Sequence, residues 1–404
     1  MAQVLITPSI IAKEALFQLE NKCVFADKSY RSYVNEFRKI GDTVSVRKPV
    51  KFRTTSGAVI SATPEVQESS VDLKIDQRHK VNWKFNTNDL TLTIEEYSKR
   101  YIEPACIALA NKIDQVGLNL YSSIWNQVGT PGTTPSTFAN IKDVAVRMDR
   151  LSIPSEREIV CNPDGAWGIA GGLVGVYNAS MVEGAYRNGT IGRVAGFGEV
   201  SMDQNVVDHT TGLHTTGSTP LMAATSSEGD ATLATDGWAN STAVLKAGDV
   251  FTIANVYDVN VVSGQKQNYL KQFVCTADVT SGAGGLATIP IAPVIYSAAA
   301  TATTMLPYQT LDVLPQDNAA ITVLGTESTA YPMNLCFHRN AFALAFIPLE
   351  MPDGCSFKAR ESKNGFSIRV IKDYDFINDE DRIRLDILFG WKAIYPELAV
   401  RLIG

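Results

Sequence analysis

The segment that decides the fold is residues 43–85, which read TVSVRKPVKFRTTSGAVISATPEVQESSVDLKIDQRHKVNWKF. Apolar and polar residues alternate along its two arms, residues 43–53 and 71–85, and the stretch between the arms is mostly polar. An alternation with a period of two is typical of a β-strand that buries one face. The segment therefore predicts a long two-stranded hairpin with a wide tip.

This hairpin carries opposite charges on its two arms. The basic residues of the first arm are Arg47, Lys48, Lys51 and Arg53, and the acidic residues toward the second are Glu65, Glu68, Asp72 and Asp76. An isolated two-stranded ribbon is marginally stable in water, so a ribbon of this length implies a supporting surface. Two interpretations stay open: a solvated strand face, or an electrostatic contact between subunits that fixes their register.

The residues before the hairpin indicate a helix without a core of its own. Ile11, Ala15 and Leu19 are four residues apart and form one apolar stripe. We expect this arm to lie against the rest of the chain or against a neighbouring subunit.

Helical patterns follow the hairpin. Thr93 and Glu96 form a possible capping box, and Pro104 suits the first turn of a second helix. Apolar residues at three, four or seven residue intervals up to Ile124 predict that this helix has about twenty residues and a length of roughly 30 Å. A further amphipathic helix is predicted for residues 137–152, a buried strand for residues 158–161, and a helical start at Asp164.

The second half of the chain is richer in strand patterns. Residues 208–240 are rich in Thr, Ser, Gly and Ala, which favours a flexible boundary. Residues 241–326 contain several β-runs separated by turns, and they predict a small β-barrel or sandwich inserted into a larger α/β domain. Alternating strands return in residues 366–371, 383–388 and 398–402.

Length and charge exclude several classes of protein. The 404 residues are too many for one ordinary core, and 45% hydrophobic with 19% charged residues is a globular composition. A protein that grips nucleic acid by its phosphates should be basic, but the net charge is -6. No basic segment followed by a long apolar run begins the chain, so no secretory signal is expected. No run of 18 apolar residues predicts a transmembrane span.

The residue types that carry chemistry are scattered. The six cysteines occur singly, which predicts reduced, buried thiols. The four histidines form no metal-binding pair, and His209 and His214 are expected in a solvated loop. The glycines of residues 165–175 and 189–198 match no phosphate loop. The acidic residues 373–381 lack the glycine of a calcium loop and predict a charged turn. We therefore expect no catalytic, cofactor-binding or metal-binding residues.

Four stretches carry a resemblance to a known family. Residues 185–200 (AYRNGTIGRVAGFGEV) resemble the central domain of the P22-like coat proteins of tailed bacteriophages, and residues 334–345 (NLCFHRNAFALA) and 390–399 (GWKAIYPELA) resemble their C-terminal half. Residues 245–249 (LKAGD) resemble the opening turn of the inserted domain of that family. The similarity runs in order along nearly the whole chain, although residues 1–80 match by pattern only.

The resemblance implies an HK97-type capsid fold of class α+β. Its parts would be an N-terminal arm (1–41), an extended β-hairpin loop (42–88), a long spine helix with the first part of the peripheral and central domains (89–220), an inserted small β-barrel (221–326), and the remainder of the central α/β and peripheral domains (327–404).

The resemblance also implies a function and partners. The chain would be the major capsid protein of a tailed double-stranded DNA bacteriophage, and it would not be an enzyme. It would assemble into pentamers and hexamers in the host cytoplasm, with a scaffolding protein and a portal protein, and later enclose DNA without sequence-specific binding and expand. Candidate intersubunit contacts are Arg47, Lys48, Lys51, Arg53, Glu65, Glu68 and Asp72. No membrane and no cofactor are expected.

Two other classes of protein are compatible with parts of the sequence. A secreted or surface β-rich structural protein, such as an adhesin, would suit the Thr, Ser and Gly content of residues 208–330, but the lone cysteines and the missing signal argue against it. A cytosolic α/β enzyme with an inserted domain would need a pocket with perturbed ionisable groups.

Overall fold

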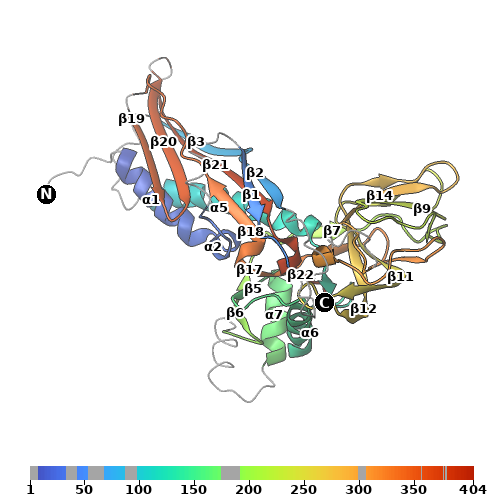
Figure 1. Cartoon of the computed structure of the whole chain (residues 1–404). Coiled ribbons are helices and arrows are strands. Elements are labelled where there is room, and N and C mark those ends of the chain that lie inside the picture. Colours follow the sequence, from blue (N-terminus) through green and yellow to red (C-terminus); the bar gives the residue numbers. More distant parts are fainter. Residues whose placement is uncertain are drawn as a thin grey trace. The chain divides into compact units, whose positions relative to one another are not determined.

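The computed structural model of the chain describes residues 8–32, 43–52, 68–86, 98–173, 192–298, 306–355, 357–375, 377 and 380–404 (Figure 1). It combines helices and strands, as the α+β prediction requires. The chain divides into two compact units. Unit 1 comprises Met1–Val46, Val71–Leu118 and Phe342–Ile394, and unit 2 comprises Arg47–Ser70, Asn119–Ala341 and Tyr395–Gly404.

The sheet of unit 1 is built around one long strand. Strand β21 (Glu380–Ala393) pairs antiparallel with β3 on one side and with β20 on the other, and its far end pairs with β18. The remaining strands are β3 (Gln77–Asn86), β18 (Phe342–Phe346), β19 (Phe357–Lys363) and β20 (Phe366–Asp375), and β19 pairs with β20.

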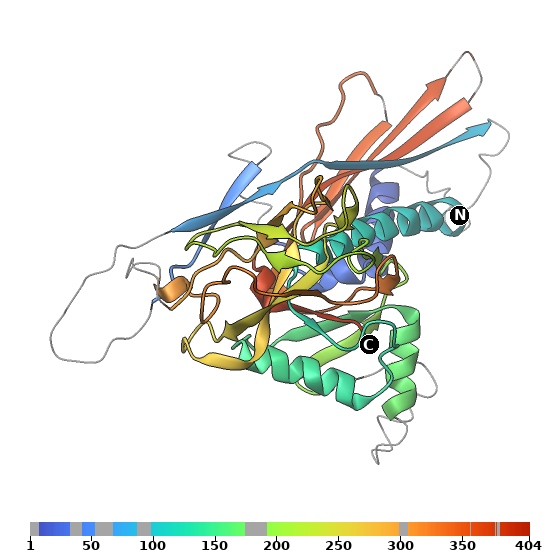
Figure 2. The same cartoon turned by 90° about the vertical axis from the view of Figure 1, so that its right-hand side faces the viewer.

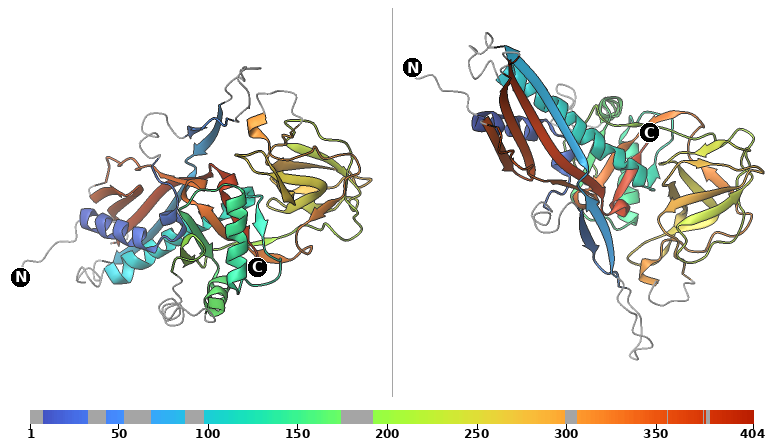
Figure 3. Two further views of the ribbon diagram at one scale, coloured as in Figure 1. Left: turned by 60° about the horizontal axis from the view of Figure 1, so that its bottom comes forward. Right: turned by 90° about the horizontal axis from the view of Figure 1, so that it is seen from above.

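Two helices pack against this sheet and against each other (Figure 3). Helix α1 (Pro8–Lys22) contacts β19 and β20, and α5 (Glu103–Leu118) contacts β21 and β3. The stripe of Ile11, Ala15 and Leu19 is buried, as the sequence predicts. The N-terminal arm thus finds its apolar partners within its own chain.

Close packing fixes α5 in unit 1. The buried carboxylate of Asp114 accepts hydrogen bonds from the backbone N–H of Val24 at 2.7 Å and of Ala26 at 3.0 Å, at the start of α2 (Phe25–Lys28). A Cβ at Gly117 would lie 2.7 Å from the Phe25 ring and 2.8 Å from the Trp391 ring, so only glycine fits there.

The predicted spine helix is present, but its two ends are not α-helical. A π-helical turn, Ser98–Ile102, precedes α5, and a 3₁₀ segment, Asn119–Ser123, continues it. The predicted apolar pattern up to Ile124 thus covers α5 and the 3₁₀ segment that finishes it, as 3₁₀ turns often do. The possible capping box of Thr93 and Glu96 lies outside the described residues.

The hairpin is shorter than the sequence predicts. Strand β1 (Thr43–Lys48) pairs with β2 (Ser69–Lys74), but β3 pairs with β21 along Glu380–Phe389. The expectation that the hairpin continues through residues 79–85 is therefore wrong. Alternation shows which residues form a strand and which face is buried, but not which distant strand supplies the partner.

The central part of unit 2 contains a mixed five-stranded sheet with helices α6 (Phe138–Arg150) and α7 (Pro163–Leu173) (Figure 2). The strand order is β4 (Gln127–Val128), β22 (Ala399–Leu402), β17 (Asn334–His338), β5 (Arg157–Cys161) and β6 (Phe197–Met202). Ile141, Val144 and Met148 of α6 join one apolar core with these strands, as their spacing predicts. The glycine-spaced residues 168–173 belong to α7.

The predicted inserted β-domain forms a second core in unit 2. Its six antiparallel strands are β15 (Ile321–Val323), β11 (Val250–Val259), β12 (Lys266–Cys275), β14 (Ala287–Ala292), β9 (Thr232–Asp236) and β8 (Leu221–Met222), in that order. A bridge between Leu221 and Ala320 brings the two edge strands together, so the sheet curves back on itself as a small barrel does. Buried aromatic and aliphatic residues fill its interior.

The expectation of a flexible boundary at residues 208–240 is wrong. These residues include β7 (Asp208–Thr210), β8 and β9, and β7 pairs with β16 (Ala330–Pro332). Short strands joined by turns rich in Thr, Ser and Gly have the same composition as a linker, so composition alone could not separate the two.

Candidate subunit-contact surfaces

The end of the β1–β2 hairpin nearest its tip exposes one charged pair. Val44 and Val46 are buried in β1, whereas Arg47 follows on the exposed side. The Arg47 guanidinium lies 3.4 Å from Glu68 Oε2, with 80% and 58% of the two side chains exposed. A solvated pair of this kind contributes roughly 0–1 kcal/mol to stability. Both groups therefore stay available to another surface.

The other predicted contact residues separate into three groups. Asp72 accepts a hydrogen bond from the Ser45 hydroxyl. Arg53 and Glu65 lie outside the described residues. Lys48 and Lys51 face a cleft of unit 2, where Lys48 Nζ lies 5.3 Å from the centre of the Tyr395 ring. Although these basic residues are neighbours in sequence, Arg47 pairs with Glu68 on the exposed side of the hairpin, whereas Lys48 and Lys51 line the cleft.

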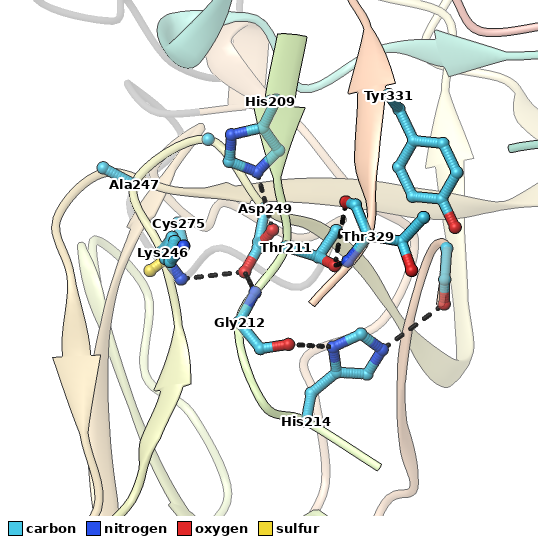
Figure 4. Close-up of polar contacts among 12 residues, drawn as sticks. His209, Thr211, Gly212, His214, Lys246, Ala247, Asp249, Cys275, Thr329 and Tyr331 are labelled. Atoms are coloured by element: carbon cyan, nitrogen blue, oxygen red, sulfur yellow. Dashed lines mark hydrogen bonds and ion pairs between the residues drawn. The ribbon is translucent and has the colours of Figure 1, made fainter. Parts of the chain in front are cut away.

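A buried polar cluster holds the start of the inserted domain (Figure 4). His209 Nε2 lies 2.7 Å from Asp249 Oδ1, and His209 Nδ1 lies 3.0 Å from the hydroxyl of Tyr121. His209 is 5% exposed and His214 is 6% exposed, so the prediction of a solvated loop is wrong. His209 contacts Tyr121 and Asp249, which are 88 and 40 positions away, and His214 Nε2 lies 3.4 Å from the carbonyl oxygen of Gly325, 111 positions away.

The second oxygen of Asp249 organises two backbone segments (Figure 4). Asp249 Oδ2 accepts hydrogen bonds from the N–H of Gly212 at 3.0 Å and of Lys246 at 2.8 Å. The first bond connects Asp249 to the segment that follows β7, and the second closes the turn before β11. One carboxylate therefore joins the entry of the inserted domain to its first long strand.

Gly248, in the same turn, is required by shape. Its φ is +104°, and a Cβ there would lie 3.2 Å from the Tyr121 ring and 3.3 Å from the His209 ring. Only glycine adopts this backbone without strain and leaves room for both rings.

Arg401 supports the turn from the C-terminal strand. Its side chain is fully buried, and Nη1 donates a hydrogen bond to the carbonyl oxygen of Gly248 at 2.7 Å. Its guanidinium carbon lies 5.3 Å from the centre of the Tyr121 ring. Burial lowers the pKa of Arg401 to about 10, partly offset by Tyr121 and Asp249, so the guanidinium stays charged at neutral pH.

Tyr121, Asp249 and Arg401 are not among the functional residues predicted from the sequence. Arg401 gave one signal, because it is a lone charge among apolar residues in the strand β22. A single charge in such a strand indicates that the side chain has a buried partner and is not solvated. Asp249 was noted only within residues 245–249, as part of a resemblance.

The thiols are those of a packed interior. Five of the six cysteines are buried, as the sequence predicts, and Cys355 is half-buried. Burial raises the pKa of Cys106 and of Cys161 to about 12, so both are protonated thiols at neutral pH.

Across the described ranges, no group of three or more His, Cys, Asp or Glu residues is placed to hold a metal ion. Within those same ranges, no helix has the length and apolar character to cross a membrane.

Comparison with known proteins identifies the family. The sequence profile of the family described as P22 coat protein, gene protein 5, matches residues 6–404. A search of curated proteins gave no match.

Solved structures of phage proteins are similar to the chain at low identity. A structure from Mycobacterium phage Che8 is 15% identical over 94% of this chain and 90% of its own, with a TM-score of 0.47. The capsid of cyanophage P-SCSP1u is 12% identical over 94% and 88% of the two chains, with a TM-score of 0.43. The CUS-3 coat protein I-domain is 23% identical over 27% of this chain and 96% of its own, with a TM-score of 0.21.

The family that matches nearly the whole chain is a family of structural coat proteins and not a family of enzymes. The alternatives of a surface adhesin and of a cytosolic enzyme are set aside on the same ground. The chain belongs to the P22 coat protein family and is a major capsid protein that forms a phage shell.

Proposed function

We propose that this coat protein builds its shell on a scaffolding protein in the host cytoplasm, leaves one vertex to a portal protein, and then encloses double-stranded DNA. Membership of the coat protein family over residues 6–404 is the observation that carries the proposal. The net charge of -6 supports an inner wall that encloses DNA without gripping its phosphates.

The hairpin is proposed to contact neighbouring subunits through Arg47, Lys48, Lys51, Arg53, Glu65, Glu68 and Asp72. The pair of Arg47 and Glu68 supports this proposal, because both side chains are largely exposed and of opposite charge. In a closed symmetric shell, many weak contacts of this kind add up to a stable assembly. Lys48 and Lys51 would contribute less, since they face a cleft of their own chain.

The division into an N-terminal arm (1–41), an extended loop (42–88), a spine region (89–220), an inserted domain (221–326) and a C-terminal remainder (327–404) is likewise proposed. The separate apolar core between Met222 and Ile321 supports the limits of the inserted domain. An inserted domain with its own core suits a role in folding or in contacts between capsomers.

Sedimentation velocity of the purified chain, alone and with the scaffolding protein of the same phage, tests the proposal. We expect slowly sedimenting subunits to shift into particles of one large sedimentation coefficient when the scaffolding protein is added. Identical profiles in both samples, with the scaffolding protein confirmed as folded, would refute the scaffold dependence but leave the family assignment intact.

A further inference from the structure

A cleft of about 560 Å³ lies in unit 2. Its walls come from the end of β1 and the residues after it (Lys48 to Lys51), from the segment after the spine helix (Trp125, Asn126), from the inserted domain and from the C-terminal segment (Tyr395 to Leu398). This volume is within the range of ligand pockets, about 300–1,000 Å³.

The lining combines apolar and aromatic surface with a few charges. Its aromatic residues are Trp125, Tyr296, Tyr308 and Tyr395, and valines and prolines make up much of the rest. Ligand sites are typically apolar cavities with a small number of polar groups that orient the ligand. The cleft has this composition.

Three lysines and two carboxylates line the cleft. Lys271 Nζ lies 2.8 Å from Asp258 Oδ1, and both side chains are buried, so this pair neutralises itself. Lys48 and Lys51 are then left with Glu397, which gives the cleft a net positive charge of one unit.

Lys51 is the cation with the fewest partners. Among the described residues its ammonium group makes neither an ion pair nor a hydrogen bond, although it is half-buried. Burial lowers the pKa of Lys51, Glu397 partly offsets this, and the positive charges of Lys48 and Lys271 lower it further. A bound anion would relieve both the desolvation and the repulsion.

A buried acceptor is present in the same cleft. Asn126 is 1% exposed, and within the described part of the chain its Oδ1 has no hydrogen-bond partner. A buried polar atom without a partner costs about 1–3 kcal/mol, which a donor on a ligand would recover.

We propose that this cleft binds a small ligand with a single negative charge on an aromatic or apolar body. The charge would bind the ammonium groups of Lys51 and Lys48, and the body would lie between the aromatic side chains. Because the ligand would contact both the inserted domain and the C-terminal segment, its binding would stabilise their mutual position. The inference is independent of shell assembly.

Fluorescence titration of the full chain with anilinonaphthalene sulfonate tests the proposal. This probe carries one negative charge on an aromatic body, and phenylnaphthylamine is its uncharged counterpart. The variants are Lys51→Met, Lys51→Arg, and the matched control Lys142→Met, whose lysine is exposed on α6 and pairs with Asp143.

We expect the wild type to bind the anionic probe at one saturable site. Lys51→Met should weaken this binding about tenfold, because a charged contact is lost. Lys51→Arg and Lys142→Met should keep it, and the uncharged probe should bind all four proteins equally. Equal binding of the anionic probe by the wild type and Lys51→Met would overturn the proposal, as would weak binding without saturation in the wild type.

If Lys51→Met lost both probes, the cleft itself would have changed. Lys48→Met then takes its place, because Lys48 is the second lysine proposed to bind the charge, and it is half-buried with its Nζ 5.3 Å from the centre of the Tyr395 ring. We expect the same selective loss of the anionic probe for Lys48→Met. Unchanged anion binding by that variant would overturn the assignment of the charge to this cleft.

Discussion

His209 and Asp249 form a buried pair, with His209 Nε2 2.7 Å from Asp249 Oδ1. The two residues are 40 positions apart in sequence and connect the strand that enters the inserted domain to the first long strand of that domain. Tyr121 and Arg401 complete the contact from the rest of unit 2. The position of the inserted domain in unit 2 thus depends on a few buried polar groups as well as on apolar packing.

The first prediction concerns Asp249. Asp249→Ala leaves the N–H groups of Gly212 and Lys246 and one nitrogen of His209 without their acceptor. We expect a loss of about 3 kcal/mol in the stability of the inserted domain, because buried donors without partners cost about 1–3 kcal/mol each. Hydrogen exchange should show the Gly212 and Lys246 amides exchanging at least about tenfold faster.

The control for this prediction is Asp317→Ala, at an exposed site of the same domain, where the carboxylate contacts the neighbouring Asn318 side chain. It should leave both amides as protected as in the wild type. Equal protection in Asp249→Ala would show that the buried carboxylate does not hold the two segments.

The second prediction concerns Gly248. Gly248→Ala places a Cβ 3.2 Å from the Tyr121 ring at a φ of +104°. Gly284 also has a positive φ, of +90°, but nothing lies within 4 Å of its would-be Cβ. We expect Gly284→Ala to cost about 1–2 kcal/mol from backbone strain alone, and Gly248→Ala about 1–3 kcal/mol more from crowding.

Thermal unfolding followed by circular dichroism measures the difference between the two glycine variants. Equal midpoints for Gly248→Ala and Gly284→Ala would mean that the Tyr121 and His209 rings move aside without cost.

The third prediction concerns cysteine reactivity. Burial raises the pKa of Cys275 to about 12, as it does for Cys106 and Cys161, so these thiols have little thiolate at about pH 8. Cys355 is half-buried. We expect intact-mass spectrometry of the native chain to show one fast alkylation by iodoacetamide, which Cys355→Ser removes. Several thiols that react at the same rate would contradict the buried positions.

The fourth prediction separates contacts within a chain from contacts between chains. Arg47→Glu and Glu68→Arg each place like charges at the pair that now spans 3.4 Å. If the hairpin meets a neighbour through these charges, each variant alone should assemble poorly and a mixture of the two should assemble well. Light scattering during assembly follows both cases.

The double variant, with both changes in one chain, is the companion to the mixture. Assembly restored in the double variant but not in the mixture would assign the pair to its own chain and would refute the proposed intersubunit role of Arg47 and Glu68.

The sequence predicted the elements whose signal is local. The stripe of Ile11, Ala15 and Leu19 gives α1, and Ile141, Val144 and Met148 give α6. Periodicity identifies such helices because the apolar residues of their buried face repeat within a few turns of sequence. The strand-rich character of the inserted domain was visible for the same reason.

The sequence could not predict contacts between distant residues. Residues 77–86 pair with β21, some 300 positions later, as in the pairing of Lys84 with Arg382. His209 is buried by Tyr121, which is 88 positions away. No local pattern of residues encodes such partners, so the histidine resembled a solvated loop residue and the hairpin looked longer than it is.

Negative-stain electron microscopy of the chain, co-expressed with the scaffolding protein of its phage, tests the central claim most directly. As a coat protein of the P22 family, the chain should form closed shells of uniform diameter, and without the scaffolding protein it should form irregular shells, sheets or tubes. Monomers or dimers alone in both samples, with the scaffolding protein present and folded, would contradict the assignment as a shell-forming protein.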